Sequence, residues 1–271
     1  MDWKKLLSEE RLRPSTRDSR FEGDKRNEFE SDYGRIAFSP AIRRMHDKTQ
    51  VFPLTTDDNI HTRLTHSIEV QSVAKSIGFD ICSRDKFLNH VEGDLEGNLK
   101  KEQTLKEYLI RRIPTILAST AFCHDIGNPP FGHYGEDIIQ NYYKELFSKE
   151  EYKEIDLTKE QKEEFINFDG NAQGFRVLTK LQILSDRFGL NLTAGTLASF
   201  LKYPCTSREY NSEEKGDYSN KIGVFESEKE HLDKVREKTG LEKERHPLAF
   251  LMEVSASPFF GPLKSRGFRL R

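Results

Sequence analysis

Apolar residues recur with the period of an α-helix along much of the chain. The clearest stripe is formed by Ile60, Leu64, Ile68, Val70, Val73, Ala74 and Ile77. Because residues three and four apart share one face of a helix, this pattern predicts a helix over residues 60–80 with one buried side. Similar reasoning predicts further helices over residues 104–124, 133–147, 160–168, 171–188, 193–202 and 228–238.

Polar segments separate these stripes. Residues 85–103 are polar and contain two glycines, so we expect a loop there. Residues 205–245 are dense in Glu, Lys and Ser, which predicts an exposed loop plus the polar helix over residues 228–238. Strand signals are sparse, and Lys221–Phe225 is the single modest candidate. The fold class is therefore predicted to be mainly α, with residues 1–33 as a charged N-terminal arm or a short helix plus loop.

The segment from Ile113 to Cys123 is almost entirely apolar or small, which predicts a buried helix that ends at the pair His124-Asp125. Both side chains cost free energy to bury unpaired, and a divalent metal resolves that cost because imidazole and carboxylate are good ligands. A turn rich in glycine and proline follows. A second helix then places His133 and Glu136 three positions apart on one face.

Arg63 and His66 lie three apart on the predicted helix over residues 60–80 and share a face. A contact between helices would bring His66 to the His124-Asp125 pair. Arg63 would then stand beside the metal, where a guanidinium can clamp a phosphate with two hydrogen bonds. His61 lies five positions from His66 and is expected to point to a different face.

Charge and cysteine content favour a cytoplasmic protein. Lys and Arg number 43 and Asp and Glu number 45, so the formal charge is −2 and suggests neither a nucleic-acid nor a membrane partner. No stretch approaches the roughly 20 apolar residues of a membrane span, and the first residues lack the apolar core of a signal peptide. An odd, scattered set of cysteines is typical of a reducing compartment. These cysteines are Cys82, Cys123 and Cys205.

The order of His66 and His124-Asp125 resembles that of the HD-domain metal phosphohydrolases. The similarity is closer to the deoxyguanosine triphosphate triphosphohydrolases (dGTPases), and it runs from about residue 21 to residue 253. Several matching sequence segments in the same order indicate a family more specifically than an isolated His-Asp pair does. The matching phrases lie at residues 35–41, 43–44, 47–53, 63–70, 124–136, 168–176, 201–204 and 245–251.

This resemblance implies an HD-domain helical bundle around a metal site. It also implies hydrolysis of a deoxynucleoside triphosphate (dGTP-like) to deoxynucleoside and intact tripolyphosphate. His66, His124 and Asp125 match the family's metal ligands, and His133 and Glu136 match its catalytic histidine and glutamate. The ligand set does not distinguish Mn, Mg, Fe, Co and Zn.

Substrate contacts are carried over from the same family. Arg63 matches a phosphate contact, Lys202 and Tyr203 resemble residues that line the triphosphate and sugar, and Gln50 and Asn171 match nucleoside contacts. By resemblance alone, a homo-oligomer and single-stranded DNA are further expected partners.

The chain departs from the family near its C-terminus. The family continues with Ala-Ala-Asp-Asp, whose first Asp completes the metal site, but the corresponding positions here fall near Ala256 and Ser257. No carboxylate follows Glu253. We therefore expect residues 34–254 to form an HD phosphohydrolase domain that is incomplete at its C-terminal end. Residues 255–271 are expected to be an aberrant tail from a shifted reading frame or a degraded gene.

Each candidate residue also has a structural interpretation, such as a buried hydrogen bond, a helix-face pair or an ion pair. That alternative applies to His66, His133, Glu136, Arg63, Lys202, Tyr203, Gln50 and Asn171. A structural role is the expectation for His46, His61, His90, His231 and His246.

Two other functions fit the same residues. The first is an HD phosphohydrolase acting on another nucleotide or on a phosphodiester. The phrases at residues 171–173 and 202–203 argue against it, because generic HD phosphodiesterases lack them. The second is a catalytically impaired, truncated HD-domain remnant that binds metal or nucleotide without turnover, or associates with intact homologues.

Overall fold

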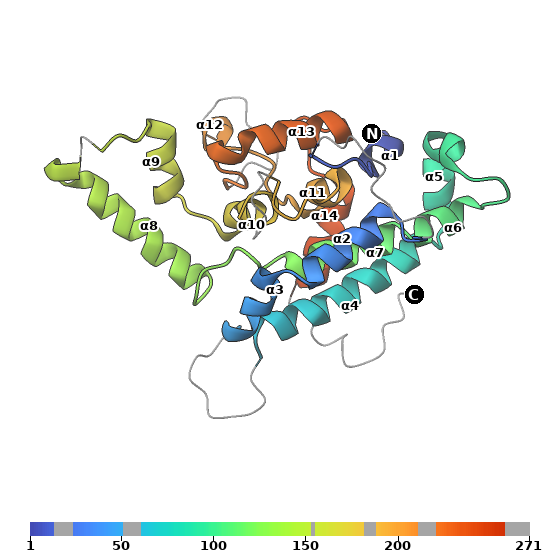
Figure 1. Ribbon diagram of the computed structural model, residues 1–271, viewed down its shortest axis with the longest axis horizontal. Helices are drawn as coiled ribbons and strands as arrows, with labels where there is room; N and C mark the ends of the chain where they lie inside the picture. The colour runs from blue at the N-terminus through green and yellow to red at the C-terminus, as the bar shows by residue number, and fades with distance from the viewer. Residues whose placement is uncertain (14–23, 51–60, 153–154, 182–187, 211–220, 258–271) are drawn as a thin grey trace.

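The computed structural model is an assembly of α-helices (Figure 1), which confirms the predicted mainly α class. It describes residues 1–13, 24–50, 61–152, 155–181, 188–210 and 221–257. The helices are α1 (Trp3–Leu6), α2 (Glu28–Ala37), α3 (Pro40–Arg44), α4 (Arg63–Ile81), α5 (Asp85–Leu95), α6 (Leu105–Ile110), α7 (Ile113–Cys123), α8 (His133–Ser148), α9 (Lys159–Ile166), α10 (Gly170–Thr179), α11 (Ala194–Phe200), α12 (Ser207–Tyr210), α13 (Lys229–Thr239) and α14 (Pro247–Ala256). Two isolated β-bridges, but no strand, occur among these described residues.

Helix α7 is the centre of the bundle. It packs against α2, α4, α11 and α14, and all of its residues except Thr115 are buried. A helix that is apolar on every side is stable only where neighbours surround it, so this sequence places α7 in the core. Ile116 and Leu117 are fully buried, and each such side chain contributes about 1.5–3 kcal/mol.

Helix α4 lies alongside α7 (Figure 1). It begins at a capping box, in which the side chains of Thr62 and Thr65 each accept a hydrogen bond from the backbone N–H of the other. The two helices are in close contact where Gly78 faces Pro114, because a Cβ at Gly78 would lie 2.7 Å from the Pro114 Cα. This close contact fixes the register of α4 on α7.

Most predicted helices are confirmed. Helices α4, α8, α9, α11 and α13 occupy the predicted segments, with shifts of a few residues at their ends. The segment over residues 104–124 forms two helices, α6 and α7, because Pro114 lacks a backbone N–H and is tolerated only in a first turn. Helix α10 ends at Thr179, and the rest of its predicted segment lies mostly outside the described residues.

Two local predictions are wrong. Residues 85–95, expected in a loop, form α5, because Val91 and Leu95 are four apart and both are fully buried. The segment Lys221–Phe225 is not a strand. The backbone N–H groups of Gly223 and Val224 both donate to the Cys205 carbonyl, so the segment is held by a single acceptor rather than by a ladder.

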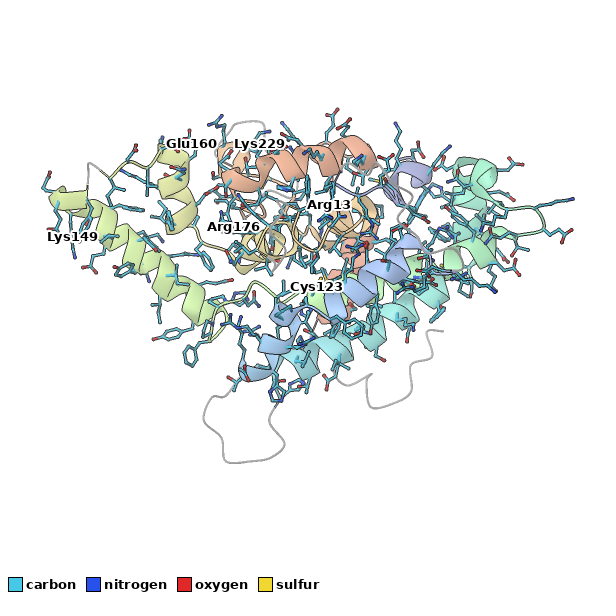
Figure 2. All side chains as sticks on the ribbon, viewed as in Figure 1. Arg13, Cys123, Lys149, Glu160, Arg176 and Lys229 are labelled. Atoms are coloured by element: carbon cyan, nitrogen blue, oxygen red, sulfur yellow. The ribbon has the colours of Figure 1, made fainter. Side chains whose placement is uncertain are left out.

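Residues 1–13 and 24–33 belong to the core rather than to a free arm. Trp3 and Leu6 of α1 are buried, and the Trp3 ring meets the Phe87 ring edge-on at 5.1 Å between centroids. Figure 2 shows Lys149 and Glu160 at the edge of the molecule and Cys123 near its centre. The predicted tail lies largely outside the described residues, although α14 continues to Ala256. Among the described helices, none is long and apolar enough to cross a membrane.

Candidate functional site

The structure brings together the three predicted metal ligands. His66 lies in the first turns of α4, and His124 and Asp125 follow the last residue of α7. One ligand atom from each side chain lies within 4.8 Å of the others, and the two imidazole centroids are 5.4 Å apart. We call these three residues the inner group. The contact between α4 and α7 therefore brings His66 and the His124-Asp125 pair, which are distant in sequence, into one cluster.

Hydrogen bonds orient the inner group. The carbonyl of Ala121 accepts a hydrogen bond of 2.7 Å from His124 Nδ1, so Nε2 is the ring nitrogen available to a metal ion. Asp125 accepts from Arg63 at 2.7 Å and from the Asn128 side-chain amide at 2.8 Å. Burial alone would raise the pKa of Asp125, but His124 and Arg63 outweigh it and hold the pKa below its ordinary value. Asp125 is therefore held in its ionised form.

Positive charge gathers beside Asp125. Arg63 is almost completely buried, and a Cβ on Gly132 would lie 2.6 Å from its guanidinium. Gly132 has a φ of +56°, a conformation that a side chain would also strain. Lys48 donates a hydrogen bond of 2.8 Å to the Asn128 carbonyl, and burial, assisted by Arg63, lowers its pKa. Glycine thus lets the start of α8 approach this cationic edge.

The predicted His133–Glu136 pair is formed in the first turn of α8. Glu136 Oε2 accepts a hydrogen bond of 2.7 Å from His133 Nδ1. The His133 side chain is 85% exposed, whereas the Glu136 side chain is only 6% exposed. Glu136 Oε1 accepts a second bond of 2.8 Å from the Gly170 backbone N–H at the start of α10. A fixed carboxylate thus orients an imidazole whose Nε2 is open to an incoming molecule.

Gly170 connects this pair with the inner group. A Cβ at Gly170 would lie 2.2 Å from Asn128 Oδ1 and 2.8 Å from Glu136 Oε1. Asn128 in turn donates to Asp125. Only a residue without a side chain fits between these groups, so the metal-ligand candidates and the His133–Glu136 pair form one continuous site.

Two residues that the sequence analysis had not singled out lie near Glu136. Asp169 caps α10 and accepts bonds of 2.8 and 2.7 Å from the backbone and side chain of Asn171. Lys221 forms an ion pair of 3.0 Å with Asp169. Burial alone would lower the pKa of Lys221, but Asp169, with a smaller effect of Glu136, raises it. Asn171 is thus tied to Asp169. The position of Lys221 in a polar segment gave no signal.

The remaining substrate candidates have other neighbours. Lys202 pairs with Glu253 of α14 at 2.6 Å, and its ammonium lies 5.3 Å from the centre of the Tyr203 ring. Gln50 donates its backbone N–H to the His61 carbonyl, and its side-chain oxygen is buried without a protein partner among the described residues. Their roles toward a substrate stay predictions.

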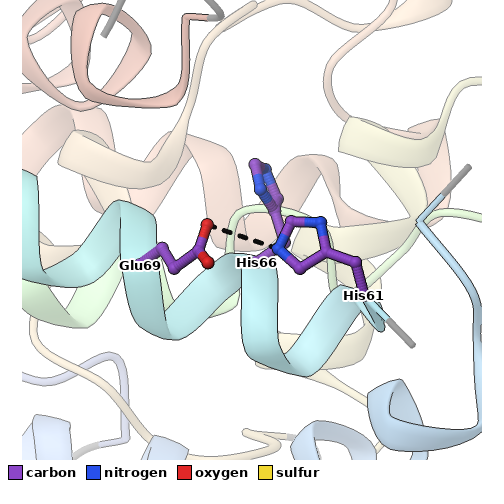
Figure 3. A group of neighbouring side chains, drawn as sticks. All are labelled: His61, His66 and Glu69. Atoms are coloured by element: carbon purple, nitrogen blue, oxygen red, sulfur yellow. Dashed lines mark ion pairs between the residues drawn. The ribbon is translucent and has the colours of Figure 1, made fainter. Parts of the chain in front are cut away.

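The prediction for His61 is wrong. Its imidazole lies edge-on to that of His66, with 5.8 Å between the centroids, and it also contacts Glu69 (Figure 3). His61 precedes Thr62, the cap of α4, so the spacing rule for helix faces does not apply to it. The extended backbone before the helix turns this side chain back toward His66.

The fold and the site define an all-α protein with a candidate metal centre of two histidines and an aspartate. No protein-family model matches the chain. A deoxyguanosinetriphosphate triphosphohydrolase-like protein of Listeria monocytogenes is 40% identical over 261 residues, covering 94% of this chain and 53% of the relative. One of Pseudomonas aeruginosa is 38% identical over 267 residues, covering 96% and 56%. The deoxyguanosinetriphosphate triphosphohydrolase of Salmonella schwarzengrund is 33% identical over 256 residues, covering 84% and 47%.

By sequence the chain belongs to the deoxyguanosinetriphosphate triphosphohydrolase family. It spans about half the length of the curated relatives it matches.

Proposed function

We propose that this site hydrolyses deoxynucleoside triphosphates (dGTP-like) to deoxynucleoside and tripolyphosphate with the help of a divalent metal. The observation that carries the proposal is the continuity of the site through Gly170 and Asn128. This continuity joins a group suited to binding metal with the His133–Glu136 pair. The names of the relatives indicate the substrate class.

The donor chemistry of the inner group fits a divalent metal. Nδ1 of His124 is taken up by the Ala121 carbonyl, so Nε2 is the nitrogen available to a metal ion, and the lowered pKa of Asp125 favours the carboxylate form that binds metal ions. His66 supplies the third donor from a different helix. A divalent cation provides Lewis acidity at such a site, which polarises a phosphoryl oxygen. Metal identity among Mn, Mg, Fe, Co and Zn is left to experiment.

The chain's own residues account for positioning and proton transfer. Glu136 accepts from Nδ1 of His133, so Nε2 can take a proton from an attacking water or give one to the leaving oxygen. Arg63 presents a buried guanidinium whose Nε has no protein partner among the described residues, and Lys48 adds a second positive charge. These groups oppose the negative charge that spreads over a triphosphate during cleavage.

The test is tripolyphosphate release from each of the four deoxynucleoside triphosphates with Mn²⁺ or Mg²⁺. We expect release by the 271-residue chain and at least a hundredfold loss in His133→Ala. His46→Ala is the matched control, because His46 is an exposed histidine that also faces a carboxylate, 3.6 Å away on Asp47. Equal release by His133→Ala and the original chain would reject the role of His133.

A second candidate is a catalytically impaired remnant that binds metal or nucleotide without turnover. It is favoured by the composition of the inner group, to which no second carboxylate belongs among the described residues. Glu253, the last carboxylate of the chain, is engaged by Lys202 and Arg245. Metal and nucleotide binding by a folded chain without product would support this candidate. Recovery of turnover on restoring the family's Asp-containing tail after Glu253 would explain the defect.

The same assay addresses the other expectations. Release of a different product, or turnover of a phosphodiester, would point to an HD phosphohydrolase of another nucleotide. Self-association, single-stranded DNA binding and a cytoplasmic location stay predictions from the resemblance and from composition.

A further inference from the structure

A second group of candidate ligands lies beside the inner group. His61, His66 and Glu69 each place one ligand atom within 4.8 Å of the others (Figure 3). His61 Nε2 is 3.3 Å from Glu69 Oε2. Two donors that share a tetrahedral zinc ion with bonds of about 2.1 Å are separated by about 3.4 Å, so this pair already has the required spacing. We call these three residues the outer group.

The backbone positions of the outer group are fixed by local structure. His66 and Glu69 are three apart and therefore lie on one face of α4. His61 precedes the cap of α4, and its carbonyl accepts a hydrogen bond of 2.9 Å from the Gln50 backbone. A β-bridge between Thr49 and Thr62 anchors the same segment. The ligand geometry thus needs only side-chain rotations.

The outer group is open to solvent. The side chains of His61 and Glu69 are 45% and 48% exposed. A hydrated ion can therefore reach them from solvent, whereas the side chains of His124 and Asp125 in the inner group are only 12% and 13% exposed. Two imidazoles and one carboxylate, with open positions for water, form a ligand set typical of zinc.

We propose that His61, His66 and Glu69 bind a zinc-like transition-metal ion at a site distinct from the inner group. His66 belongs to both groups. A neutral imidazole offers one nitrogen lone pair, so His66 serves one ion at a time. Occupation of the outer group therefore withdraws His66 from the inner group. Zinc at the outer group would then oppose the metal that supports turnover, a consequence that rests on the proposed function, whereas the binding itself does not.

The alternative is a simple surface ion pair between His61 and Glu69, which would contribute at most about 1 kcal/mol and bind no metal. The chain contains a matched control for that alternative. His46 also faces a carboxylate, 3.6 Å away on Asp47, and both side chains are exposed. That pair belongs to neither group of three candidate ligands among the described residues.

The decisive experiment measures Zn²⁺ binding to His124→Ala by isothermal titration calorimetry. This background weakens the inner group and keeps Asp125 paired with Arg63. We expect one zinc ion per chain, and at least a tenfold weaker affinity after His61→Ala or Glu69→Gln is added. Addition of His46→Ala should change nothing. Failure of His124→Ala to bind zinc, or equal affinity with and without His61, would overturn the proposal.

Cobalt provides a second readout in His124→Gln, because the inner group of the unmodified chain would offer Co²⁺ the same donor types. Co²⁺ bound by two histidines and a carboxylate in four-coordinate geometry gives intense visible absorption, and its spectrum should change when His61→Ala is added while circular dichroism stays the same. An unchanged spectrum would count against the outer group even if His124→Ala failed to fold.

Activity tests the consequence separately. Micromolar Zn²⁺ should inhibit turnover supported by Mn²⁺, and His61→Ala should raise the inhibitory zinc concentration at least tenfold. If the chain has no turnover, the proposed function fails and the binding measurements alone decide on the outer group. Zinc binding that depends on His61, combined with equal inhibition of both chains, would reject the competition for His66.

Discussion

At the scale of single residues, Asp125 connects three side chains of the candidate site. It accepts from Arg63 and Asn128 and lies 3.4 Å from His124 Nε2. The Arg63 and Asp125 side chains are only 6% and 13% exposed, so solvent screens this ion pair weakly. A buried cation that loses its carboxylate partner keeps the cost of its desolvation.

We therefore expect Asp125→Asn to lower the free energy of unfolding by about 3 kcal/mol in metal-free buffer. Asp80→Asn is the matched control, because the Arg84–Asp80 pair is 54% and 31% exposed, and its loss should cost less than about 1 kcal/mol. Urea denaturation followed by circular dichroism measures both changes. Similar values for the two variants would show that burial does not strengthen the Arg63–Asp125 pair.

Residues whose chemistry is local in sequence could be predicted. The adjacency of His124 and Asp125 and the three-residue spacing of His133 and Glu136 need no knowledge of tertiary structure. Lys48 and Lys221 could not be predicted, because their partners, the Asn128 carbonyl and Asp169, come from distant segments. His61 was misplaced because a helix rule was applied beyond the helix.

At the scale of elements, a single histidine joins the last described helix to the first. His246 caps α14, and its Nδ1 accepts a hydrogen bond of 3.1 Å from the Leu248 backbone. Its Nε2 donates at 3.1 Å to the Leu6 carbonyl at the end of α1. Burial lowers the pKa of His246 to about 4, so the folded chain holds the neutral imidazole, as expected for a structural histidine.

This pKa predicts acid instability. Below pH 6.5, the usual pKa of histidine, His246 of the unfolded chain binds a proton. In the folded chain His246 is not protonated until the pH falls to about 4. The contribution is fully present above pH 6.5, and about 3 kcal/mol should be lost between pH 6.5 and pH 4. His246→Asn, which retains a capping side chain, should flatten the dependence of unfolding free energy on pH, whereas His46→Asn should not. An unaltered slope in His246→Asn would contradict this assignment.

Element existence was more predictable than element boundaries. The helical stripes identified α4, α8, α9, α11 and α13, because each buries one face. Helix α5 was missed because its polar composition and Gly93 outweighed a short stripe that includes Val91 and Leu95. The division between α6 and α7 follows from Pro114, whose effect depends on where the helix begins.

At the scale of the whole molecule, the core encloses all three thiols. Cys82, Cys123 and Cys205 are free and buried in different parts of the fold. Burial raises the pKa of Cys82 to about 12 and raises that of Cys123 further. Because thiolates are the reactive form, the folded chain should be inert toward thiol reagents.

We expect a disulfide reagent such as 5,5′-dithiobis(2-nitrobenzoate) to modify no cysteine of the native chain within minutes at pH 8. All three should react once denaturant is added. The rate of labelling then reports opening of the fold, and a divalent metal that binds the folded state should slow it. Rapid labelling of one thiol without denaturant would show that its part of the core opens locally.

The packing of distant helices in the whole molecule was harder to predict from the sequence than single residues or helices. The one-domain interpretation of residues 34–254 left out α1, although Trp3 and Leu6 pack in the same core. Helix α1 has only four residues, and so short a segment shows no periodic pattern from which its packing partners could be predicted. Its place depends on α5, α11 and α13, which lie far along the chain.

The docking of α1 has a consequence for synthesis on the ribosome. Trp3 and Leu6 are translated before their neighbours α11 and α13 and before His246, whose Nε2 donates to the Leu6 carbonyl. Until those later segments have been made, the nascent chain carries these two apolar side chains uncovered, a feature that chaperones bind. Trp3 is the only tryptophan in the sequence, so its fluorescence reports when α1 packs into the core beside Phe87.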